Sequence, residues 1–142
     1  MGDRIRVLVL CTGNSARSQM AEGLLRDLGG ELVEVASAGV SPGHVRPEAI
    51  AVMQEVGIDI SSQRSKSVDE FAGREFDYVI TVCDNANELC PAFPGRTRRI
   101  HWSFEDPGAV AGDDVRTLEV FRRVRDQIAG RLKEFVASQP QR

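Results

Sequence analysis

The chain carries one segment near its start whose residue types and spacing could do covalent chemistry on an anion. Residues 11–17 read Cys-Thr-Gly-Asn-Ser-Ala-Arg, and Ser18 follows. A cysteine thiolate is a strong nucleophile, and an arginine guanidinium can hold two oxygens of one anion with paired hydrogen bonds. The segment therefore predicts that Cys11 attacks a tetrahedral oxyanion that Arg17 binds.

The Cys-x5-Arg spacing is weak support on its own, because the chain is rich in arginine and contains a second match from Cys90 to Arg96. Local context separates the two segments. The first has no proline and lies between an expected strand and an expected helix. The second contains Pro91 and Pro94, which have no N–H group to donate. We therefore expect only the first segment to bind an oxyanion.

A loop that cradles a tetrahedral anion needs successive backbone N–H groups that point inward and the N-terminus of a helix behind them. Gly13 allows the backbone dihedrals that such a loop requires. The same donors favour the thiolate form of Cys11, and the Ser18 hydroxyl could add a hydrogen bond to the sulfur. The oxyanion-binding residues that we expect are Thr12, Gly13, Asn14, Ser15, Ala16, Arg17 and Ser18.

The elements that must position this loop alternate along the chain. Apolar runs predict strands at residues 5–10, 32–38, 77–83 and 97–102, the last of them at an edge of the sheet. Helical spacing of apolar residues predicts a helix after the loop that Ser15 caps, a second that Pro47 begins, a short one at 67–72, and a long C-terminal helix.

This alternation predicts an α/β fold in three layers, a four-stranded parallel sheet with helices on both faces and right-handed crossovers. We expect a single domain over residues 1–142. Ligands in such folds bind beyond the carboxyl ends of the strands. Cys11 and Cys83 each stand at the end of an expected strand, so they share one crevice if those strands are neighbours.

Composition limits the partners. The formal net charge of −3 is unlike the basic footprint of a nucleic-acid-binding protein. No signal peptide is visible, and no apolar stretch approaches the roughly 20 residues that span a bilayer. We therefore expect a cytoplasmic monomer that binds neither nucleic acid nor a membrane.

Intracellular cysteines are most often small buried hydrophobes, and only their positions argue for more in this chain. The spacing from Cys83 to Cys90 does not match ordinary zinc sites, and His44 and His101 are the only histidines. We therefore expect no bound metal.

The segment CTGNSARSQMAEG at residues 11–23 resembles the family of thioredoxin-coupled arsenate reductases, which share a fold with low-molecular-weight protein tyrosine phosphatases. The resemblance continues through SAG at 37–39, GIDIS at 57–61, VITVC and CP around the later cysteines, and HWSFEDP at 101–107. It covers roughly residues 5–136 and implies a low-molecular-weight phosphatase-like sheet flanked by helices.

The resemblance implies a relay of three cysteines. Cys11 attacks arsenate, and Cys83 then attacks the arseno-cysteine, so that a Cys11–Cys83 disulfide forms and arsenite leaves. Cys90 attacks Cys83 in turn, and thioredoxin reduces the Cys83–Cys90 disulfide. Glutathione with glutaredoxin is the alternative reductant. The expected partners are arsenate, with phosphate or sulfate as its analogues, and thioredoxin, and no cofactor stays bound.

The family's proton donor lies in a motif that Glu105-Asp106-Pro107 matches. Asp106, before the proline, aligns best, and Glu105 is the alternative. An Asp-Pro pair without the surrounding match would be an ordinary turn.

Some family members bind a potassium ion beside the loop. Asn14, Glu22 and Ser37 match those ligand positions, but Lys66 stands where an acidic ligand is found. We expect the Lys66 ammonium to take the place of the cation near Glu22, with a solvated loop lysine as the alternative.

Two other functions fit the same loop. A low-molecular-weight phosphatase would use Cys11 and Asp106 on a phosphate ester, although Gly108-Ala109-Val110 stands where aromatic residues usually grip a substrate ring. Weak phosphatase activity would also be compatible with arsenate reduction. A non-catalytic oxyanion-binding or redox-sensing module would bind the anion without turnover.

Overall fold

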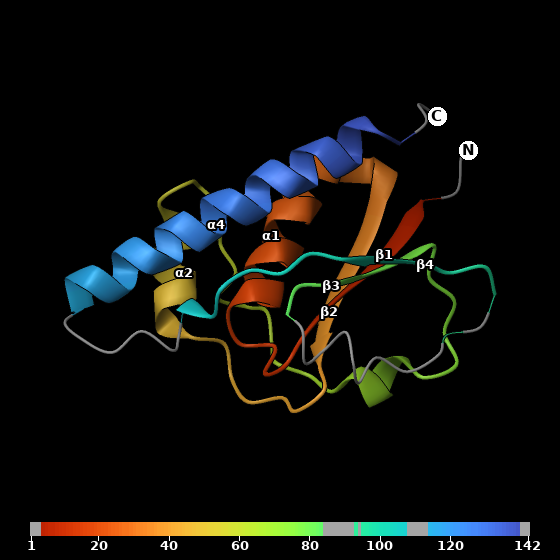
Figure 1. Ribbon diagram of the computed structural model, residues 1–142, viewed down its shortest axis with the longest axis horizontal. Coiled ribbons are helices and arrows are strands. Elements are labelled where there is room, and N and C mark those ends of the chain that lie inside the picture. The colour runs from red at the N-terminus through yellow and green to blue at the C-terminus, as the bar shows by residue number, and fades with distance from the viewer. Residues whose placement is uncertain (1–3, 84–92, 94, 108–113, 140–142) are drawn as a thin grey trace.

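The computed structural model describes residues 4–83, 93, 95–107 and 114–139 (Figure 1). Its strands are β1 (Ile5–Cys11), β2 (Val33–Gly39), β3 (Tyr78–Thr81) and β4 (Arg98–His101). Its α-helices are α1 (Arg17–Gly29), α2 (Pro47–Gln54) and α4 (Asp114–Ala137). Two short 3₁₀ helices complete the described elements, η1 (Gly30–Leu32) and η2 (Val68–Phe71).

The four described strands form one parallel sheet in the order β2-β1-β3-β4, which confirms the predicted four-stranded parallel sheet. The central strand β1 is apolar and buried along most of its length because it has a neighbour on each side. The polar strand β4 lies at an edge, as its sequence predicts. Leu10 of β1 pairs with Ala38 of β2 and Thr81 of β3, so these three strands end at the same level.

The α-helices pack together against the sheet. Helix α1 contacts both β1 and β2, α4 lies along α1, and α2 packs against α4. Figure 1 shows these three helices on one side of the sheet and η2 on the other. The core is built from β1, the central part of β3 and the inner faces of α1 and α4, with Leu8, Leu25, Ile80 and Phe121 fully buried.

Local details differ from the sequence predictions at several points. Pro47 begins α2 as expected. Ser15 does not cap α1: the helix begins at Arg17, after Ala16, and has no side-chain cap. Strand β3 ends at Thr81, although the Val82 amide still donates to the Leu10 carbonyl at 2.9 Å. No helix in the described part of the chain is both long and apolar enough to cross a membrane.

Candidate active site

Cys11 is the last residue of β1, and the loop that follows leads directly into α1. The thiol is buried, with 2% of the residue exposed. Its Sγ lies 2.8 Å from Ser18 Oγ and accepts a hydrogen bond from the Asn14 amide at 3.2 Å. Two hydrogen-bonding groups of the loop therefore converge on this sulfur, in front of the N-terminus of a 13-residue helix.

The carbonyl groups of the loop are held on its outer side. Backbone amides from residues 40–46 and the Ser65 hydroxyl donate to the carbonyl oxygens of Cys11, Thr12, Gly13 and Ser15, over 2.9–3.3 Å. The carbonyl and the following N–H of a peptide unit point in opposite directions, so the N–H groups after these carbonyls turn toward the inside of the loop. This arrangement creates the concave row of donors that an oxyanion cradle requires.

Gly39, at the end of β2, allows the loop to lie directly against the sheet. A Cβ atom at this position would lie 2.6 Å from the Thr12 carbonyl oxygen and 2.9 Å from the Asn14 amide nitrogen. Both atoms are backbone, so any larger residue would push the loop away. The SAG segment at residues 37–39 is therefore part of the site.

Asn14 adopts a left-handed backbone conformation with φ 47°, which is unfavourable for a residue with a side chain but tolerated best by asparagine. Its side chain is fully buried and holds the strained residue in place. The Asn14 Nδ2 group donates to Ser18 Oγ at 2.7 Å and to Ser37 Oγ at 3.0 Å. The Asn14 Oδ1 atom accepts from Gln19 Nε2 at 2.9 Å and from the Lys66 amide at 3.0 Å.

Lys66 lies beside Glu22, as the sequence predicts, with its Nζ 3.5 Å from Glu22 Oε1. The side chains of Glu22 and Lys66 are 7% and 12% exposed. Ser37 Oγ also donates to Glu22 Oε1, at 2.7 Å. Because an ammonium already faces the carboxylate, these residues do not fit a potassium ion. Among the described residues, no group of three or more His, Cys, Asp or Glu could hold a metal.

Arg17 connects the loop to the segment that carries the expected proton donor. Its Nη1 donates to the Phe104 carbonyl at 3.1 Å, and its Nη2 lies 3.9 Å from Asp106 Oδ2. The Asp106 side chain is about half exposed, whereas Arg17 is largely buried. The neighbouring Glu105 pairs instead with Arg123 of α4. The geometry therefore favours Asp106 over Glu105 as the acid beside the loop.

Cys83 lies just beyond β3, beside the oxyanion loop. Its thiol is buried, and its Sγ lies 3.2 Å from Thr12 Oγ1. Thr12 directly follows Cys11, so the strand order brings the first two cysteines of the expected relay to one end of the sheet. Cys90, like Gly108 to Val110, lies outside the described residues.

Two glutamines contribute to the site although sequence reasoning did not select them. Gln19 is fully buried and contacts Asn14, and Gln63 donates to Gln19. A signal was available, because the polar residues Gln19, Glu22 and Arg26 recur along α1 at helical spacing. A polar stripe on the helix that follows an oxyanion loop indicates that another segment supplies hydrogen-bond partners to it.

One cavity of the described surface lies away from this site. A cavity of about 510 Å³ opens at the amino end of the sheet, where its walls include Arg4, Arg6, Glu75 and Asp77. None of the residues that line it is a cysteine or a histidine. The two described cysteines, Cys11 and Cys83, lie at the opposite end of the sheet.

Comparisons with known proteins agree with this site. A family model described as low molecular weight phosphotyrosine protein phosphatase matches residues 6–141. An arsenate reductase of Halalkalibacterium halodurans is 46% identical over 129 residues, which make up 91% of this chain and 93% of that protein.

Solved structures show the same fold. An arsenate reductase in the phosphate binding state has 39% identity and a TM-score of 0.77, over 94% of this chain and 97% of the other. A thioredoxin-dependent arsenate reductase of Corynebacterium glutamicum has 30% identity and a TM-score of 0.71, over 97% of this chain and 65% of that one. The chain therefore belongs to the low molecular weight phosphotyrosine protein phosphatase family, and within it to the arsenate reductases.

Proposed function

We propose that this protein reduces arsenate to arsenite with Cys11 as the nucleophile, and so serves in arsenic detoxification. The observation that carries the proposal is the position of Cys83. A phosphatase needs one thiolate in its loop, whereas a reductase needs a second thiol within reach of the first. Here the Cys83 sulfur contacts the residue that follows Cys11.

In the first step the inward N–H groups of residues 12–18 and the Arg17 guanidinium bind the arsenate oxygens. The Cys11 thiolate attacks arsenic, an As–S bond forms, and one oxygen leaves as water. Hydroxide is a poor leaving group, so a proton must be supplied to it. Asp106 lies beside Arg17 and is half exposed, which suits a carboxyl group that exchanges protons with solvent.

In the second step the Cys83 thiolate attacks Cys11 Sγ. A disulfide forms between the two sulfur atoms, and the electron pair of the broken S–As bond remains on arsenic, which leaves as arsenite. The two thiols are thus oxidised by two electrons while arsenic is reduced by two. The Thr12 hydroxyl can donate to Cys83 Sγ and so favour the attacking thiolate.

In the third step Cys90 attacks Cys83 Sγ, which forms the Cys83–Cys90 disulfide and frees the Cys11 thiolate for another turnover. A dithiol reductant then reduces this disulfide by exchange. We propose thioredoxin as that reductant, because a related enzyme is described as thioredoxin-dependent. Glutathione with glutaredoxin is the alternative. The cycle requires reduced thiols, which the cytoplasm maintains.

The decisive experiment follows NADPH oxidation that depends on arsenate, in the presence of thioredoxin and thioredoxin reductase. We expect turnover by the wild type and no sustained turnover by Cys11→Ser, Cys83→Ser or Cys90→Ser. Full turnover by Cys83→Ser would remove the relay. Replacing thioredoxin with glutathione, glutaredoxin and glutathione reductase tests the reductant in the same assay.

Phosphatase activity is the second candidate, because the phosphatase family model matches the chain and because Asp106 beside Arg17 could protonate a leaving alcohol. Hydrolysis of p-nitrophenyl phosphate separates the two functions. A reductase with weak phosphatase activity keeps this slow hydrolysis in Cys83→Ser while it loses arsenate turnover. A phosphatase would hydrolyse the ester efficiently and show no arsenate turnover in the wild type. An oxyanion-binding module would show neither activity.

A further inference from the structure

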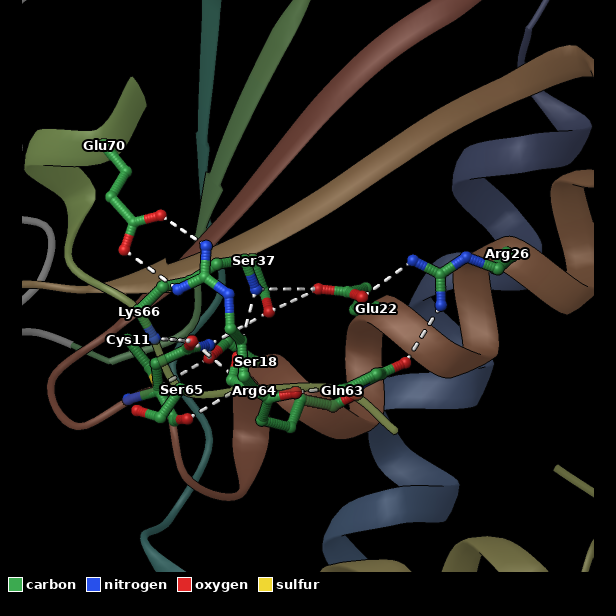
Figure 2. A network of polar contacts seen from close by, with 12 residues as sticks. Cys11, Ser18, Glu22, Arg26, Ser37, Gln63, Arg64, Ser65, Lys66 and Glu70 are labelled. Atoms are coloured by element: carbon green, nitrogen blue, oxygen red, sulfur yellow. Dashed lines mark hydrogen bonds and ion pairs between the residues drawn. The ribbon is translucent and has the colours of Figure 1, made fainter. Parts of the chain in front are cut away.

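Six side chains behind the oxyanion loop form a closed ring of hydrogen bonds, which we name the loop ring. Figure 2 shows four of them, Ser37, Glu22, Arg26 and Gln63, together with Cys11 and Ser18. In order around the ring the members are Asn14, Ser37, Glu22, Arg26, Gln63 and Gln19, and every link measures 2.7–3.0 Å. The ring joins α1, β2 and the loop around Gln63 to the strained residue Asn14.

The direction of the links is fixed by two charged members, Arg26 and Glu22, and by two backbone groups outside the ring. The Lys66 amide donates to Asn14 Oδ1 at 3.0 Å, and the Arg64 carbonyl accepts from Gln19 Nε2 at 2.9 Å. Arg26 can only donate, so it must meet the Oε1 atom of Gln63, and the Nε2 group of Gln63 then faces Gln19. Glu22 can only accept, so it takes the hydrogen of the Ser37 hydroxyl and one from Arg26. If the side-chain amide of Gln63, Gln19 or Asn14 were flipped, two donors or two acceptors would face each other.

This direction reaches Asn14 through Gln19. The Oε1 atom of Gln19 accepts from Gln63, and its Nε2 group faces the loop. There the Nε2 group has three acceptors: Asn14 Oδ1 at 2.9 Å, the Asn14 carbonyl at 3.0 Å and the Arg64 carbonyl at 2.9 Å. The Nδ2 group of Asn14 must then be a donor, and it donates to Ser18 Oγ at 2.7 Å. The only hydrogen of the Ser18 hydroxyl is thus left for Cys11 Sγ, 2.8 Å away.

We propose that Gln19 and Gln63, anchored by Arg26, are positioning residues that make Ser18 a donor to the Cys11 sulfur and thereby favour its thiolate. They act through Asn14 and Ser18 and touch neither the sulfur nor the substrate. This inference rests on the proposed role of Cys11 as the nucleophile. It adds to that role a directional network that begins at a half-exposed arginine on the outer side of α1.

The test measures the rate of Cys11 alkylation by iodoacetamide against pH, in a Cys83→Ser/Cys90→Ser background in which Cys11 is the only thiol. We expect Gln19→Met and Gln63→Leu to raise the pH at which alkylation is half-maximal by about 0.5–1 unit, which is the effect of one weakened hydrogen bond to the thiolate. Gln54→Leu, the same change at an exposed residue of α2, should leave this pH unchanged.

Arg26 supplies a conservative pair of variants. Arg26→Lys keeps a donor at the ring and should stay near the wild-type profile, whereas Arg26→Met should move toward the Gln63→Leu profile. The other charged or titratable groups near the loop, Arg17, Glu22, Lys66 and Asp106, are retained in every variant. If Arg26→Lys keeps the wild-type profile while Arg26→Met loses it, the difference comes from the donor at position 26.

The outcomes separate this inference from the proposed function. If Cys11 reacts readily and Gln19→Met and Gln63→Leu leave the profile unchanged, the positioning role is wrong and the nucleophile stands. If Cys11 in the background protein reacts no faster than free cysteine at neutral pH, the proposed nucleophile itself is wrong. Urea unfolding of each variant verifies the fold. Gln63 and Arg26 are partly exposed, so variants at these two positions still test the positioning role if Gln19→Met does not fold.

Discussion

Two polar networks in this molecule both combine glutamate with arginine, but they are built differently. In the loop ring, Glu22 is buried, and its bond to Ser37 leads inward through the Asn14 amide and the Ser18 hydroxyl to the Cys11 sulfur. Between α2 and α4, Glu55 instead pairs directly with two arginines, Arg122 at 2.8 Å and Arg125 at 3.0 Å. We call this second group the helix cluster.

The difference teaches how each network can act. In the loop ring, neutral amides and hydroxyls carry the direction set at the Glu22–Arg26 pair inward to Ser18, so the ring can orient a distant group. Ion pairs near the surface are weak, screened and dependent on protonation. We therefore expect changes around the loop ring to alter the reaction, and changes in the helix cluster to alter stability with pH.

The largest effect is expected at Arg17. Arg17→Lys keeps the charge but loses the paired donors that match two oxygens of a tetrahedral anion. We expect kcat/KM for arsenate to fall by about 100- to 1000-fold, the range seen when one donor to a developing charge is removed. The same change in the helix cluster, Arg122→Lys, should leave kcat/KM within about two-fold of the wild type. Equal losses in both variants would contradict the comparison.

The next effect separates the two adjacent carboxylates. Asp106→Asn should lower arsenate turnover by about 100-fold or more, because the leaving oxygen loses its proton donor. Glu105→Gln should change turnover by about two-fold at most, because Glu105 faces Arg123 of α4 and not the loop. Steady-state kinetics at neutral pH measure both. A larger loss in Glu105→Gln would make Glu105 the acid.

How much the sequence reveals differs between these features. Cys11 and Arg17 could be predicted because their loop is one continuous segment between a strand and a helix. The parallel sheet followed from alternating elements, and it brought Cys83 to the same end. The expected cap at Ser15 was wrong because residues 11–15 are bound to their neighbours through their carbonyls, and the helix starts only after Ala16.

The loop ring could not be predicted as a whole, because its links join residues far apart in the chain. Gln19 and Gln63 are 44 positions apart, and Ser37 and Glu22 are 15 apart. Nothing in the local sequence of Gln63 indicates a partner on α1. The Lys66–Glu22 pair was predicted only because the family resemblance placed both residues at one cation site.

The contribution of the helix cluster to stability should depend on pH. Hydrogen bonds from Arg122, followed by those from Arg125, hold the pKa of Glu55 below its ordinary value of 4.5. A lowered folded-state pKa means that the stabilisation is complete above about pH 4.5 and is lost as the pH falls through the folded-state pKa. We therefore expect Glu55→Gln to lower the urea midpoint at pH 7 and to match the wild type at pH 2.

Salt and activity complete this test. At pH 7 the difference between Glu55→Gln and the wild type should shrink in 1 M NaCl, because both side chains of the Glu55–Arg122 pair are exposed and the Debye length at this salt concentration is only about 3 Å. Arsenate turnover should stay at the wild-type level. A stability difference that persists at pH 2 would assign the effect to packing between the helices rather than to charge.

The smallest expected effect concerns Lys66, the only lysine beside the loop ring. Its Nζ donates to the Arg64 carbonyl at 3.2 Å and lies 3.5 Å from Glu22 Oε1. A potassium ion at this carboxylate would meet a fixed positive charge at contact distance, which opposes binding. Arsenate turnover should therefore differ by less than about two-fold between potassium chloride and sodium chloride at the same ionic strength, because the two salts screen charges equally. Strong activation by potassium alone would show that the ammonium moves aside, and that this part of the network is adjustable rather than fixed.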